Sequence, residues 1–123
     1  MSLNLEFPHS ELRDVATEGD AVRLRFAAAT VRDADDERGW LASVQVEIDG
    51  AALQGDATHA FGKIAEGSLR LDGRAARLSV PGALSGGIEL ALRLANGTQF
   101  VVQGRALTAS AAEGARFAPD LSC

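Results

Sequence analysis

Two histidines, His9 and His59, are the residues of this chain best suited to proton transfer or metal binding. Glu11 and Asp14 follow His9, and Asp56 precedes His59. Imidazole and carboxylate groups serve as zinc ligands and general bases, so a metal-dependent hydrolase site would form if the two segments met. A structural hydrogen bond at each histidine explains the same residues, and we favour that interpretation. We therefore assign no catalytic and no metal-binding residue.

An acidic segment at 33–37 offers a second kind of site. Its sequence, Asp-Ala-Asp-Asp-Glu, holds enough carboxylate oxygens for a calcium ion, but the spacing matches no EF-hand loop. Arg32 and Arg38 flank the segment. A solvated loop neutralised by these arginines accounts for the composition without a cation, and we predict no metal or other cofactor.

Nucleophilic catalysis finds little support. The chain has no Gly-x-Ser-x-Gly element, and its glycine-rich segment 82–87 lies between two expected strands with no helix to hold a phosphate. We interpret 82–87 as a flexible connection. Cys123 has no basic neighbour to stabilise a thiolate and, as the single cysteine, cannot form an internal disulfide.

Trp40 is the single tryptophan in a chain with five Phe and no Tyr. It is either a large side chain of the core or a partly exposed platform, and the scarcity of other large groups favours the core. As a platform, with Arg23, Arg25 or Arg93 as polar contacts, it would serve a small-molecule-binding or carbohydrate-binding β domain. Together with His9 and His59, Trp40 completes our set of candidate ligand-binding residues.

Composition restricts the class of protein. With 123 residues, 46% apolar and 24% charged, the chain predicts one globular domain over 1–123, with 111–123 as a loosely attached tail. A net charge of −5 disfavours nucleic acid as a partner. The chain has no long apolar run and no basic start followed by an apolar stretch, so we expect no membrane association and a cytoplasmic location.

Period-two alternation is the main structural signal. Ile88–Leu94 alternates apolar with small or charged residues, as a half-buried strand does. Asn96-Gly97 follows and predicts a hairpin with a type I′ turn into residues 98–103. The segment 10–16 fits one helical turn or a bulged strand, and we favour the strand. Similar alternation predicts further strands at 3–7, 22–26, 44–48, 69–71, 76–80 and 105–109.

Turn signals about every ten residues, without a helical pattern between them, favour antiparallel topology and exclude parallel α/β folds. We predict an all-β protein, an antiparallel β-sandwich or closed barrel of about eight to nine short strands joined by hairpins. Function is expected on the loops at 32–39 and 55–62 and on the connection at 82–87.

The opening segment 7–12 (Phe-Pro-His-Ser-Glu-Leu), Val15, the segment 22–26 (Val-Arg-Leu-Arg-Phe) and Trp40 resemble a group of short bacterial all-β proteins with no assigned role. The resemblance implies no catalytic residues. It implies that His9 and Ser10 form a structural corner in which the His9 side chain satisfies backbone groups.

These observations favour a non-enzymatic protein-interaction or structural module, because an antiparallel sheet with exposed edges can bind a protein partner or a second copy of itself. Homodimerisation through an edge strand fits this hypothesis. The small-molecule or carbohydrate-binding domain and the metal-dependent hydrolase remain the alternatives.

Overall fold

The computed structural model describes residues 3–112 and 117–119, and within them the chain forms ten β-strands and no helix. The alternation of apolar and polar residues is the cause, because successive side chains of a strand point to opposite faces. The strands are β1 (Leu3–Glu18), β2 (Ala21–Arg32), β3 (Arg38–Asp49), β4 (Ala52–Gly55), β5 (Gly62–Leu71), β6 (Arg74–Ala75), β7 (Leu78–Val80), β8 (Gly82–Leu94), β9 (Gln99–Ala111) and β10 (Phe117–Pro119).

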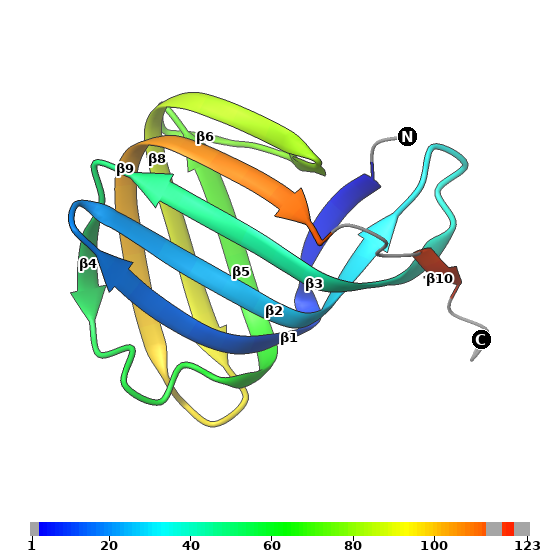
Figure 1. The fold of residues 1–123 in the computed structure, drawn as a ribbon, viewed down its shortest axis with the longest axis horizontal. Helices are drawn as coiled ribbons and strands as arrows, with labels where there is room; N and C mark the ends of the chain where they lie inside the picture. The colour runs from blue at the N-terminus through cyan, green and yellow to red at the C-terminus, as the bar shows by residue number, and fades with distance from the viewer. Residues whose placement is uncertain (1–2, 113–116, 120–123) are drawn as a thin grey trace.

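Six of these strands close into an antiparallel barrel (Figure 1). The sheet runs β10-β3-β2-β1-β5-β8-β9-β4, and an additional pairing between β3 and β9 joins its two ends into a ring of β1, β2, β3, β9, β8 and β5. β4 extends the sheet from β9, β6 pairs with β5, and β7 pairs with β1. The prediction of an all-β fold is confirmed, and the architecture is a closed barrel with added strands.

The barrel interior is filled by aliphatic side chains. Every second residue of the central strands points inward, and the inward residues form one hydrophobic cluster that includes Phe26 and Phe100. The large aliphatic side chains that are almost completely buried include Leu12, Val22, Leu24, Val31, Val44, Ile48, Ile64, Leu78, Leu90, Leu94 and Leu107. This packing is the main source of stability in such a domain.

Bulges divide the first three strands into a barrel part and an extension. Pairing between β1 and β2 is interrupted between Glu6 and Glu11, where His9 has a φ of 70°, and Ser43 of β3 has a φ of 58°. Before these bulges β1 pairs with β7, and β3 pairs with β10. A Cβ at Gly39 would lie 2.3 Å from the Phe117 ring, so the glycine makes room for the side chain that β10 places there.

Two contacts complete the ring, and they differ in kind. The β3–β9 seam consists of six consecutive residue pairs, from Val44–Ala111 to Asp49–Ala106. The β1–β5 seam has only two, Glu11–Lys63 and Leu12–Gly62. Next to these two pairs the strands meet through side chains.

Phe7 and Gly67 make that contact. Phe7 is 6% exposed, and a Cβ on Gly67 would lie 2.5 Å from the Phe7 Cβ. The benzyl group therefore occupies the space that a side chain on β5 would need. Between Phe7 of β1 and Gly67 of β5, the two strands are therefore joined by side-chain packing and not by backbone pairing.

The segment 10–16 and the hairpin at Asn96-Gly97 form largely as predicted. Segment 10–16 is a strand, as we favoured. The hairpin at Asn96-Gly97 is confirmed, but its turn is not type I′, because only Gly97 has positive φ (92°) and its N–H bonds the Leu94 carbonyl. A pair of positive φ values occurs instead at Asp72 (52°) and Gly73 (81°).

The glycine-rich segment 82–87 is not a flexible connection. It forms the first half of β8, where Gly82–Ser85 pair with β9, and Gly86 and Gly87 form a bulge. The Asp72 carboxylate accepts a hydrogen bond of 2.8 Å from the Gly87 N–H. Glycine is needed there because Gly86 has a φ of 136° and a Cβ on it would lie 2.9 Å from that carboxylate.

The segment 111–123 that we predict as a tail is described only in part. Ala111 ends β9, and the Ala112 N–H bonds the Ser43 carbonyl. Residues 117–119 form β10. Residues 113–116 and 120–123, which include Cys123, lie outside the described residues.

Candidate functional site

His9 and Ser10 lie at a corner of β1, and the hydrogen bonds that hold this corner are made by Ser10. Ser10 is fully buried, and its hydroxyl donates to the Glu6 carbonyl (2.6 Å) and accepts from the Thr30 N–H (2.8 Å). These bonds take the place of the ladder that the bulge interrupts. The His9 side chain is exposed and makes no hydrogen bond to the described residues, so the expectation that it satisfies backbone groups was wrong.

His59 lies on the loop 56–61, between β4 and β5. It is exposed, and its ring meets the Phe61 ring edge to face at 6.3 Å between centroids. Beside it is a hollow of about 400 Å³ lined by Asp56, His59 and residues 96–99. His9 does not line this hollow, and the described ranges hold no group of three or more His, Cys, Asp or Glu side chains that could ligate a metal.

The loop that carries His59 is tied to the turn between β8 and β9. The Asn96 side-chain amide donates to the carbonyls of His59 (3.0 Å) and Phe61 (3.4 Å). The Thr98 hydroxyl donates to the His59 carbonyl at 3.3 Å. Asn96, which the sequence indicated only as a turn residue, therefore holds two loops together.

Phe61 is the most unusual side chain of this loop. It is 55% exposed, and it is the only large apolar residue that is exposed in the described part of the chain. We call the loop 56–61 together with the turn 95–98 the Phe61 tip. No pattern in the sequence marked Phe61, because the loop shows no alternation from which its exposure could be inferred.

Asp56 stabilises the start of the same loop. Its carboxylate accepts hydrogen bonds from the Thr58 hydroxyl (2.5 Å) and the Thr58 N–H (2.9 Å). These bonds, more than the nearby His59, hold the pKa of Asp56 below its ordinary value. A negative charge therefore lies beside the imidazole at neutral pH.

Trp40 is not part of the core, contrary to our expectation. It is half-buried on β3, on the face opposite Gly39 and Leu41, both of which are buried. In the sheet it lies between Thr30 of β2 and Ala118 of β10. It lines none of the hollows described here.

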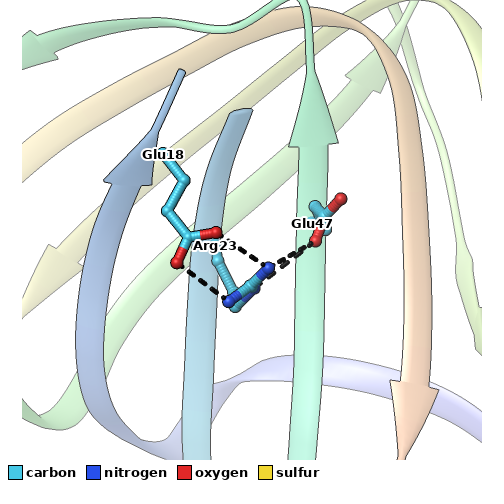
Figure 2. A network of polar contacts seen from close by, with 3 residues as sticks. All are labelled: Glu18, Arg23 and Glu47. Atoms are coloured by element: carbon cyan, nitrogen blue, oxygen red, sulfur yellow. Dashed lines mark hydrogen bonds and ion pairs between the residues drawn. The ribbon is translucent and has the colours of Figure 1, made fainter. Parts of the chain in front are cut away.

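The three arginines considered as polar contacts have different partners. Arg23 lies between Glu18 and Glu47, with its Nη2 at 3.2 Å from a carboxylate oxygen of each (Figure 2). Arg25 donates through Nε (2.8 Å) and Nη2 to the Asp14 carboxylate, and this pairing lowers the pKa of Asp14. Both are held by ion pairs on the barrel surface.

Arg93 has a single ion pair and lines a larger hollow. Its Nη2 lies 3.0 Å from Glu66, whose side chain is 75% exposed. The hollow has a volume of about 710 Å³ and lies over β4, β5, β8 and β9. Its lining residues are Gln54, Gly55, Glu66, Gly67, Ser68, Ala91, Leu92, Arg93, Gln99, Phe100 and Val101.

The acidic segment 33–37 is closed by hydrogen bonds of Asp33 and an ion pair of Asp36. The Asp33 carboxylate accepts from the N–H groups of Asp35 and Glu37, each at 2.9 Å. The Arg32 guanidinium forms two ion pairs, with its Nη1 at 3.4 Å from Asp36 Oδ1 and its Nε at 3.1 Å from Glu6 Oε2. The arrangement is that of a solvated loop closed by its own side chains.

Within residues 3–112 and 117–119 no helix is long and apolar enough to cross a membrane. No protein-family model, curated protein or solved structure matches this chain.

Proposed function

We propose that this protein is a non-enzymatic protein-interaction module and that the Phe61 tip is its contact site. The observation that carries the proposal is the 55% exposure of Phe61, the only large apolar side chain that is exposed among the described residues. The Phe61 ring packs against the His59 ring, and Asp56 and Thr98 line the hollow on which His59 borders. An exposed aromatic side chain with polar neighbours is typical of an interface with an aromatic anchor.

Preorganisation of the loop supports this function. Binding costs less when the contacting groups are already ordered. The side chains of Asn96 and Thr98 donate hydrogen bonds to the His59 carbonyl of the loop. The His59 and Phe61 rings also make an edge-to-face contact. An aromatic side chain with two rotatable bonds on such a loop can enter a pocket of a partner at small entropic cost.

A protein partner fits this chain better than a nucleic acid, because the net charge is −5 and the tip itself contributes Asp56. Self-association is the other form of the same proposal. The outer edge of β4 ends the sheet, and its residues (Ala-Leu-Gln-Gly) include none of the charged side chains that discourage edge pairing.

Site-specific photocrosslinking tests the proposal. A photoreactive phenylalanine analogue at position 61 is compared with the same analogue at Gln103, an exposed position on the outer face of β9. We expect a discrete crosslinked protein species from position 61 and none from position 103. A species formed by the purified protein alone identifies a second copy as the partner, and one that needs cell extract identifies another protein.

Equal or absent crosslinking at positions 61 and 103 would contradict the assignment of the tip. Circular dichroism of both labelled proteins confirms that each is folded before the comparison is made.

A further inference from the structure

The hollow beside Arg93 has a volume of about 710 Å³, and its lining has two chemical parts. Its floor is a row of small outward side chains, Ser68, Ala91 and Val101, which are direct partners across β5, β8 and β9. One side is a row of longer polar residues, Glu66, Arg93 and Gln99, also direct partners. Gln54 of β4 lies at the end of the floor.

Sheet geometry gives the size of the group that this floor can hold. Neighbouring strands lie about 4.8 Å apart, so the floor from Ser68 to Val101 is about 9.6 Å wide. The polar row is two residues further along the strands, at about 6.7 Å. A single planar ring fits the floor, and a charged substituent on that ring reaches the polar row.

Arg93 supplies the charge that such a substituent would meet. Its partner Glu66 is 75% exposed, and an ion pair that is so open to water is weak. Arg23 has two carboxylate partners and Arg25 has a two-point bond to Asp14. Of these three arginines, Arg93 therefore loses the least free energy when its carboxylate partner is replaced by another.

We propose that this hollow binds a small aromatic carboxylate. The ring packs on Ala91 and Val101, and the carboxylate accepts hydrogen bonds from the Arg93 guanidinium in place of Glu66. The side-chain amides of Gln99 and Gln54 are placed to donate to further polar substituents on the ring. Gln99 lines both this hollow and the one beside His59, so the site adjoins the Phe61 tip, but it does not depend on the proposed interaction.

Nuclear magnetic resonance titration with benzoate tests the site. We expect saturable shifts of the backbone amides of Ser68, Ala91 and Val101, and weaker shifts with benzamide, which has the ring without the charge. Acetate, which has the charge without the ring, should also bind more weakly. Equal affinity for benzoate and benzamide would overturn the proposal.

Two variants of the ion pair should change the affinity in opposite directions. Arg93→Met removes the charged donor and should weaken benzoate binding by about tenfold. Glu66→Gln frees Arg93 and removes a negative charge, so it should strengthen binding severalfold. Arg25→Met, on β2 outside this hollow, is the matched control and should leave benzoate binding unchanged.

The proposal fails if Arg93→Met binds benzoate as the wild type does, or if Glu66→Gln binds it no more tightly. It also fails if the shifts do not saturate, or if Arg25→Met weakens binding as much as Arg93→Met, because general attraction of an anion to surface arginines would then explain the result. Comparison of the amide spectra shows whether each variant keeps the fold.

Discussion

The two seams that complete the barrel show two ways of joining strand edges. At the β3–β9 seam, six consecutive residue pairs continue the ladder without interruption. At the β1–β5 seam, two pairs are followed by the contact of Phe7 with Gly67, next to the bulge in β1. The first seam depends on the backbone, and the second depends on particular side chains.

This difference has a structural cause. Pro8 has no N–H to give to a ladder, and the bulge around His9 turns β1 away from regular pairing. The backbone groups freed there still need partners, and the Ser10 hydroxyl supplies two of the bonds. We therefore expect the β1–β5 seam to be the more sensitive of the two to side-chain substitution.

The largest effect is expected for Phe7→Ala. The substitution leaves a cavity beside Gly67 and should lower the free energy of unfolding by about 3–5 kcal/mol. Hydrogen exchange is the sharper measurement, because the amide of Leu12 at the β1–β5 seam should lose protection while those of Val46 and Leu107 at the β3–β9 seam keep theirs up to global unfolding.

Phe100→Ala is the control for cavity formation, since Phe100 is also buried but lies on β9 away from the β1–β5 seam. It should destabilise the fold without selective exchange at the Leu12 amide. Uniform loss of protection at both seams in Phe7→Ala would show that the seams are not independent.

An intermediate effect is expected for Ser10→Ala. The change leaves the Thr30 N–H and the Glu6 carbonyl without their hydroxyl partner inside the protein, which should cost about 1–3 kcal/mol. Urea unfolding measures the loss. Ser110→Ala, an exposed serine on β9, should change stability little. If the two variants were equally stable, the hydroxyl would not be what holds the bulge.

The smallest effect is expected for Asp14→Asn, at the place where regular β1–β2 pairing resumes. The bond to Arg25 lowers the pKa of Asp14, so the ionised carboxylate stabilises the folded state. This stabilisation is complete above the ordinary aspartate pKa of about 3.9. It is lost as the pH falls through the lower folded-state pKa.

Thermal unfolding of wild type and Asp14→Asn across this pH range gives the measurement. The wild type should be slightly more stable at neutral pH, and the difference should disappear in acid. A difference that grew as the pH fell would contradict the assigned role of Asp14.

The alternation of apolar and polar residues was enough to predict the strands, because successive side chains of a strand point to opposite faces and only one face is buried. Ile88–Leu94 and Val22–Phe26 lie in strands as expected. The bulges were not predictable, since a single extra residue leaves no periodic signal. The glycines at 86 and 87 were misread for this reason, because a bulge inside a strand and a flexible connection have the same composition.

The candidate sites could not be predicted without the register of the sheet, because strand pairing brings their residues together. Ser68, Ala91 and Val101 are far apart in sequence and become a floor only when three strands align. Phe61 is exposed on a loop whose backbone bonds the Asn96 side chain, a contact between residues 35 positions apart. Neither relation leaves a local pattern that a single sequence could show.

The β3–β9 seam also governs the order in which the chain can acquire its shape during synthesis. β1, β2 and β3 form a meander whose hairpins join neighbouring segments, so they can pair as soon as the ribosome releases them. Their inward faces stay open to water until β9, the last barrel strand to be made, reaches β3. The nascent chain therefore carries an incomplete barrel until β9 has been made, and chaperones bind such incomplete states.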